Sequence, residues 1–68
     1  MRLIYKNDCK PCEMLKYVIK MAGVENVTLV DIQSLSDDEK KELSVVPTLY
    51  YNGERANGLI QCLKVIVG

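Results

Sequence analysis

The chain has no histidine and only three cysteines among its 68 residues. Structural zinc takes four ligands, so a zinc site within one chain would need all three cysteines and a carboxylate, an unusual set. The sequence also lacks an excess of either charge, because nine basic residues balance nine acidic ones. A balanced charge gives no reason to expect binding to nucleic acid or to an anionic membrane surface.

Long hydrophobic runs are missing as well. No stretch approaches the roughly 20 apolar residues that a membrane span requires. The N-terminal segment turns polar at Lys6, too early for a secretory signal, so a cytoplasmic location is expected. In the cytoplasm a permanent structural disulfide is disfavoured, and a close pair of cysteines is better explained by redox chemistry or metal binding.

What the chain does have is enough apolar sequence for one small folded domain. Hydrophobic residues make up 49% of the sequence, far too many for a disordered chain. We therefore expect a single domain over residues 1–68. A domain of this size buries only about 60% of the surface that its unfolded chain exposes.

The most informative motif is Cys9-Lys10-Pro11-Cys12. Two thiols at this spacing allow one to attack a disulfide and the other to resolve the mixed disulfide that forms. The motif stands between a short apolar run and a helical pattern, a context typical of a thioredoxin-like redox pair. A helix N-terminus favours a thiolate at Cys9, and Lys6 and Lys10 add to this effect, whereas Asp8 opposes it.

The apolar and turn patterns predict the order β-α-β-α-β-β-α. The strands are expected at residues 3–5, 27–30, 48–51 and 54–56, and the helices at about 9–21, 36–43 and 59–67. Pro11 suits a first helical turn and Gly23 a helix end. Ser36 and Glu39 have capping-box spacing, and Asn52-Gly53 predicts a two-residue hairpin turn.

Two apolar stripes are expected to form the helical part of the core. On the first helix the stripe predicted to be buried consists of Met14, Leu15, Val18, Met21 and Ala22. On the last helix Cys62 shares a stripe with Leu59 and Ile66, and we expect it to be a core residue rather than a third redox thiol.

The element order also predicts the fold class. Strands one and two are joined by a helical crossover and should be parallel, whereas the hairpin adds antiparallel pairing. The expected fold is α/β, with a mixed sheet of about four strands flanked by helices. Cys9 and Cys12 would then lie beyond the carboxyl end of the first strand, where open α/β sheets place their sites.

With this arrangement the chain resembles the thioredoxin/glutaredoxin superfamily, in particular short glutaredoxin-like redoxins with a CxPC motif. The resemblance covers essentially the whole chain. It is carried by Lys6-Asn7-Asp8-Cys9-Lys10-Pro11-Cys12, by Val45-Val46-Pro47, and by Asn52-Gly53 followed by Asn57-Gly58. It implies a minimal thioredoxin fold and a disulfide reductase in which Cys9 is the nucleophile and Cys12 the resolving thiol.

The resemblance also implies a substrate site. Pro47 should be cis and lie beside the dithiol, and Val46 before it should pair through its backbone with the bound substrate. The other candidate substrate-binding residues are Lys6, Lys10, Pro11, Asn57 and Gly58. No metal or cofactor is implied, because a reversible Cys9–Cys12 disulfide carries the electrons. The expected partners are disulfide-containing proteins and an electron donor, with the protein itself a monomer.

Three alternatives stay open from the sequence. Glutathione-binding glutaredoxins carry an acid after their glycine pair, whereas this chain continues Leu59-Ile60-Gln61 after Gly58 and lacks the acid, so a thioredoxin-reductase-type donor is favoured over glutathione. The cysteine pair could instead be half of a zinc site, completed by Cys62 and a carboxylate or by a second chain. The domain could also be a non-catalytic interaction module that retains the fold.

Overall fold

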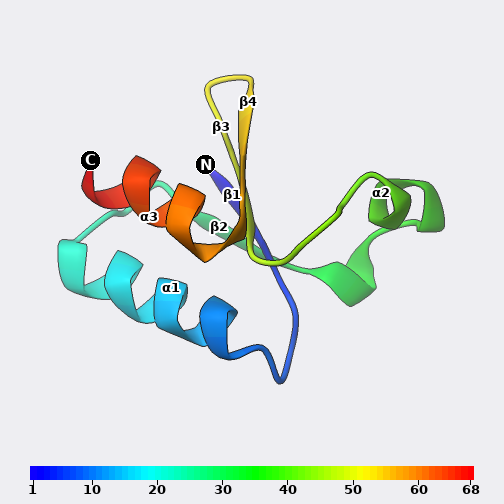
Figure 1. Cartoon of the computed structure of the whole chain (residues 1–68), viewed down its shortest axis with the longest axis horizontal. Helices are drawn as coiled ribbons and strands as arrows, with labels where there is room; N and C mark the ends of the chain where they lie inside the picture. Colours follow the sequence, from blue (N-terminus) through cyan, green and yellow to red (C-terminus); the bar gives the residue numbers. More distant parts are fainter.

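The order of strands and helices is the predicted one with a single short addition. The structure is a computed structural model that describes all 68 residues. Its elements are β1 (Arg2–Tyr5), α1 (Lys10–Ala22), β2 (Thr28–Asp31), the 3₁₀ helix η1 (Ile32–Ser34), α2 (Asp37–Lys41), β3 (Thr48–Tyr51), β4 (Glu54–Asn57) and α3 (Gly58–Val67) (Figure 1). The boundaries differ from the predicted ones by no more than two residues, and those of β3 are as predicted. The sequence analysis did not predict η1.

The four strands form one mixed sheet in the order β2-β1-β3-β4. β1 pairs in parallel with β2 and antiparallel with β3, and β3 pairs antiparallel with β4. Leu3 lies opposite both Leu29 and Leu49, and Leu49 lies opposite Ala56. The predicted α/β class and the predicted pairing are therefore confirmed.

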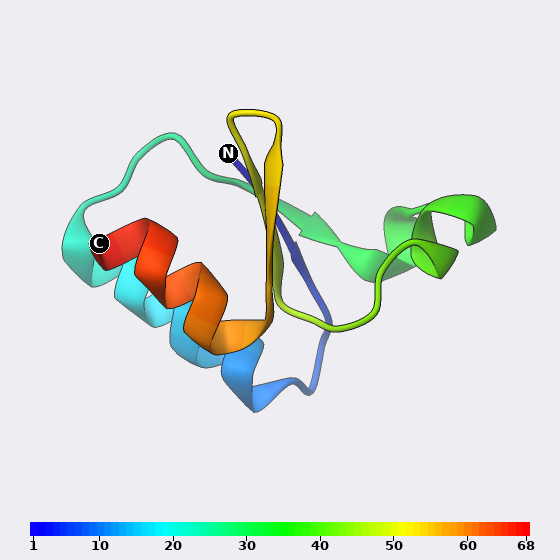
Figure 2. The ribbon, with the colours of Figure 1, turned by 45° about the horizontal axis from the view of Figure 1, so that its top comes forward.

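Two of the three helices cover the same face of the sheet. α1 and α3 pack side by side there, whereas α2 stands apart on the other side of the sheet (Figures 1 and 2). Six buried residues form the core between the sheet and the two helices: Leu3, Leu15, Ile19, Leu49, Ala56 and Cys62. The predicted core position of Cys62 is confirmed. None of the helices has the length and apolarity that crossing a lipid bilayer would require.

The ends of α1 follow from local sequence signals. Cys9 is the N-cap, with extended backbone, and its sulfur accepts a hydrogen bond from the backbone N–H of Cys12 at 3.2 Å. The helix therefore begins at Lys10 rather than at Cys9, and Pro11 lies in its first turn as predicted. Gly23 ends the helix in the left-handed conformation, with φ of 72°.

The predicted buried stripe of α1 is wrong in part. Cys12, Leu15 and Ile19 form the buried side, whereas Met14 and Met21 are 56% and 68% exposed. Ala22, also predicted to be buried, is exposed as well. Positions 14 and 21 project from the side of a 3.6-residue helix opposite to positions 12 and 19. The two methionines therefore do not fill the core. Their position reflects a helix with apolar residues on two faces, of which only one contacts the sheet.

Candidate active site

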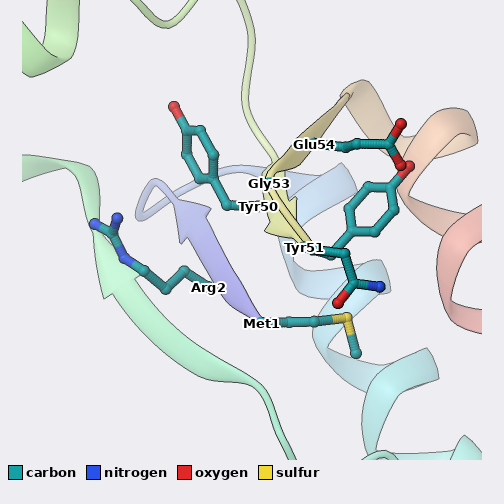
Figure 3. A pocket seen from close by; sticks show the side chains of 7 residues that line it. Met1, Arg2, Tyr50, Tyr51, Gly53 and Glu54 are labelled. Carbon is teal, nitrogen blue, oxygen red and sulfur yellow. The ribbon is translucent and has the colours of Figure 1, made fainter.

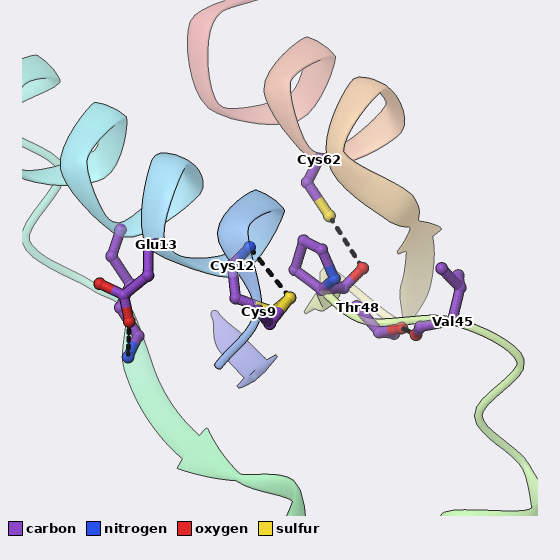
Figure 4. Close-up of a disulfide and its surroundings, with 8 residues drawn as sticks. Cys9, Cys12, Glu13, Val45, Thr48 and Cys62 are labelled. Carbon is purple, nitrogen blue, oxygen red and sulfur yellow. Dashed lines mark hydrogen bonds and ion pairs between the residues drawn. A yellow bond between two sulfur atoms is a disulfide. The ribbon is translucent and has the colours of Figure 1, made fainter. Parts of the chain in front are cut away.

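The two cysteines of the motif lie where the loop after β1 enters α1. They form a disulfide with their Cα atoms 5.2 Å apart (Figure 4). Cys9 is half-buried at the N-cap position, whereas Cys12, one turn into the helix, is completely buried. An incoming disulfide would therefore meet Cys9 before Cys12.

An open hollow of about 480 Å³ adjoins Cys9 and is lined by Asp8, Cys9, Lys10 and Glu13. Lys10 brings the cation that the sequence predicts there. Asp8 and Glu13 add two carboxylates to the same hollow, and the Glu13 carboxylate lies 3.9 Å from the Lys16 ammonium group. The surroundings of Cys9 thus carry both signs of charge, and the backbone N–H of Cys12 is the group that contacts its sulfur.

The segment before β3 stands beside the disulfide. Figure 4 shows Val45 of this segment, Thr48 at the start of β3 and Cys62 of α3 around the Cys9–Cys12 pair. The Val46–Pro47 peptide bond is cis, the geometry that the resemblance implies for this proline. The Pro47 side chain is fully buried, and the Thr48 hydroxyl donates a hydrogen bond to the Val45 carbonyl.

Lys6 lies in a different hollow from Lys10. This second hollow, of about 240 Å³, is lined by Lys6, Ile32, Leu43, Ser44, Val45 and Val46. Lys6 is its only charged residue and makes no ion pair in the chain. The backbone N–H and C=O of Val46 make no hydrogen bond within the protein. The hollow thus offers apolar walls, one cation and free backbone groups to a bound peptide.

Of the predicted pair Asn57 and Gly58, Gly58 is the one that is hydrogen-bonded to the segment that contains Pro47. The Gly58 N–H donates to the Pro47 carbonyl at 2.8 Å, which ties the start of α3 to the segment before β3. The Asn57 N–H donates to the Gln61 side-chain oxygen at 2.9 Å. The Gln61 side chain therefore caps the first turn of its own helix. Pro11 is exposed on the first turn of α1.

The contact between Cys62 and the Pro47 carbonyl is one that the sequence does not predict. The Cys62 sulfur lies 3.7 Å from the Pro47 carbonyl and 3.5 Å from the Ala56 carbonyl, within hydrogen-bonding range for a thiol. Burial raises the pKa of the Cys62 thiol, and a backbone hydrogen bond at Leu49 offsets this only in part. No sequence signal distinguishes this cysteine from an ordinary core residue, because the contact depends on how α3 packs.

The metal-binding alternative needs at least three ligands at one place. The structure brings no three Cys, Asp or Glu side chains together in this way, and the set of Cys9, Cys12, Cys62 and a carboxylate is not assembled.

A further hollow lies at the β3–β4 hairpin, at the other end of the sheet (Figure 3). Its lining includes Arg2, whose guanidinium group lies 5.7 Å from the centre of the Tyr50 ring, and Glu54. It contains no thiol and no pair of carboxylates, so it offers no group for the chemistry considered above.

Comparison of the chain with protein-family models, with curated proteins and with solved structures finds no match. The residues and geometry of this chain are therefore the basis for assigning a function. They combine a half-buried thiol that adjoins an open hollow with a completely buried partner thiol, an arrangement that suits thiol–disulfide exchange.

Proposed function

We propose that this protein is a small thiol–disulfide oxidoreductase with a thioredoxin-like fold, which reduces disulfides in protein substrates. One observation carries the proposal: Cys9 and Cys12 lie at the start of α1 in disulfide contact, with Cys9 half-exposed and Cys12 buried. This asymmetry is what a nucleophilic and a resolving thiol require. The mixed sheet with α1 and α3 on one face is compatible with a minimal thioredoxin fold.

The reaction proceeds by two exchanges at sulfur. The Cys9 thiolate attacks one sulfur of the substrate disulfide, so that a mixed disulfide forms and the other substrate sulfur leaves as a thiolate. Cys12 then loses its proton and attacks the Cys9 sulfur, which releases the second substrate thiolate. Substrate gains two electrons and takes up protons from solvent. The protein is left with the Cys9–Cys12 disulfide, the form seen in the structure.

The substrate is best accommodated as an extended peptide between Cys9 and the Val46–Pro47 segment. The unpaired backbone groups of Val46 support this placement, because an extended peptide needs backbone partners. Lys6 and the apolar walls of its hollow would contact the residues next to the substrate cysteine. Disulfides flanked by aliphatic and acidic residues are therefore the favoured substrates.

The oxidised protein needs two electrons from an external donor. A thioredoxin-reductase-type donor is favoured over glutathione because no acid follows Gly58. The first polar side chain after Gly58, that of Gln61, is engaged by the Asn57 N–H at 2.9 Å.

The test of the proposal is turnover of insulin, a general protein disulfide, with dithiothreitol as electron donor. Cys9→Ser should abolish turnover above the rate with dithiothreitol alone, because no nucleophile remains. Cys12→Ser, reduced and freed of dithiothreitol before it is mixed with insulin, should accumulate a covalent adduct with the substrate that added dithiothreitol then reverses. Met21→Gln, on the exposed side of the same helix, is the matched control and should turn over normally. Turnover by Cys9→Ser, or no adduct with Cys12→Ser, would contradict the proposal.

A further inference from the structure

We infer that Cys62 is a positioning residue for substrate, whose thiol holds the Val46–Pro47 segment in place against α3. The inference rests on the proposed function, because the position of this segment matters only when a substrate disulfide lies between it and Cys9. Cys62 itself would not take part in thiol exchange.

The geometry places Cys62 behind the segment that faces the dithiol. Its side chain is completely buried, and its sulfur lies 3.7 Å from the carbonyl oxygen of Pro47 and 3.5 Å from that of Ala56 (Figure 4). One carbonyl comes from the residue before β3 and the other from β4. A single thiol of α3 thus contacts both arms of the hairpin near its base.

The Val46–Pro47 segment has few other anchors. Val46 makes no backbone hydrogen bond, and the Thr48 hydroxyl at the start of β3 donates to the carbonyl of Val45, the residue before the segment. Pro47 is connected to α3 by its carbonyl, which accepts the Gly58 N–H at 2.8 Å and contacts the Cys62 sulfur. Removing the thiol takes away one of these two connections.

A buried thiol suits this role because it stays protonated. Only the neutral form of cysteine has a hydrogen to donate to a carbonyl. Burial raises the pKa of Cys62, so the donor form persists at neutral pH. The same burial keeps Cys62 from competing with Cys9 for substrate.

Three variants separate the hydrogen-bond donor from the volume of the side chain. Cys62→Ser keeps a donor, Cys62→Val fills the site without one, and Cys62→Ala leaves a gap and no donor. Valine is larger than cysteine and alanine is smaller, so a change in side-chain volume would affect these two variants in different ways. An effect that both variants show and the serine variant does not is therefore due to loss of the hydrogen-bond donor. Far-UV circular dichroism and thermal unfolding show which variants are folded, and the comparison of serine with valine suffices if alanine fails to fold.

The readout is reduction of two disulfides of different size, insulin and the small aromatic disulfide dithiobis(nitrobenzoate). Cys62→Val and Cys62→Ala should raise KM for insulin about twofold to tenfold, the range for loss of one neutral hydrogen bond, with kcat unchanged. Cys62→Ser should stay within about twofold of wild type. The small disulfide does not extend along Val46, so its rate of reaction with Cys9 should be the same in all proteins.

Two results would overturn the inference. One is equal KM for insulin in the serine and valine variants, and the other is a parallel loss of rate with both disulfides. Neither of these two results contradicts the proposed function, provided that the wild-type protein reduces insulin. If wild type itself fails to reduce insulin and its dithiol shows no redox transition, the proposed function fails instead.

Discussion

Replacing Gly58 by alanine should destabilise the protein and also weaken substrate binding. Gly58 has φ of 82°, a region that residues with a side chain rarely adopt, and nothing lies within 4 Å of the position of an added Cβ. No steric clash therefore contributes, and the cost is the conformational one of about 1–2 kcal/mol. For a domain of this size, each kcal/mol should lower Tm by about 4–8 °C.

The functional part of the effect comes from the Gly58 N–H, which donates to the Pro47 carbonyl at 2.8 Å. A backbone shift that relieves the strain would lengthen this bond and move the segment that faces the dithiol. KM for insulin should then rise about twofold to tenfold, the equivalent of one hydrogen bond.

Gly23→Ala is the matched control. Gly23 has φ of 72° and equally open space around its Cβ position, but it ends α1 far along the chain from Pro47. Both variants should lose similar stability in thermal unfolding followed by circular dichroism, and only Gly58→Ala should change KM. Gly58→Asn should recover part of the loss, because asparagine tolerates the left-handed conformation. An unchanged Tm for Gly58→Ala, or an equal rise in KM for Gly23→Ala, would refute the reasoning.

Two further predictions concern the core. Leu15→Ala should lower the free energy of unfolding by about 2–5 kcal/mol, because Leu15 is completely buried, whereas Met14→Ala on the exposed face should change it by about 0.5 kcal/mol or less. Urea denaturation of the oxidised protein measures both, and equal losses would contradict the packing described for α1. The raised pKa of Cys62 predicts a pH effect: above about pH 8.5 the unfolded thiol ionises while the buried one stays protonated. Stability should therefore be complete below this pH and fall as pH rises through the folded pKa, by at most about 1.4 kcal/mol per pH unit. Cys62→Ser should lose this component, and an unchanged pH profile would argue against a buried thiol.

The parts of the fold that were predicted correctly have local causes. Asn52 and Gly53 form the hairpin turn with positive φ values of 46° and 76°, as an Asn-Gly pair predicts. Ser36 and Glu39 make both hydrogen bonds of the capping box. In contrast, the apolar pattern of α1 marks two faces, and sequence alone does not show which one meets the sheet. Met14 was therefore assigned to the core wrongly.

In the candidate site, too, the features that the sequence predicts have local causes, and the others depend on tertiary structure. Cys9 and Cys12 were found from their spacing, because their contact is made within one helical turn. The separation of Lys6 from Lys10 into different hollows depends on the path of the loop between β1 and α1. The contact of Cys62 with Pro47 joins residues 15 positions apart and depends on tertiary packing, so no local pattern predicts it.

The most direct test of the account is a redox titration of the purified protein in defined thiol–disulfide buffers, with free thiols counted by the mass gained on alkylation. We predict a single two-electron transition confined to Cys9 and Cys12, with Cys62 alkylated only after unfolding. A midpoint near about −270 mV would favour a thioredoxin-reductase-type donor, and one nearer about −200 mV would favour glutathione. The absence of a transition, or thiols that stay masked until a chelator is added, would contradict the account and favour a metal site.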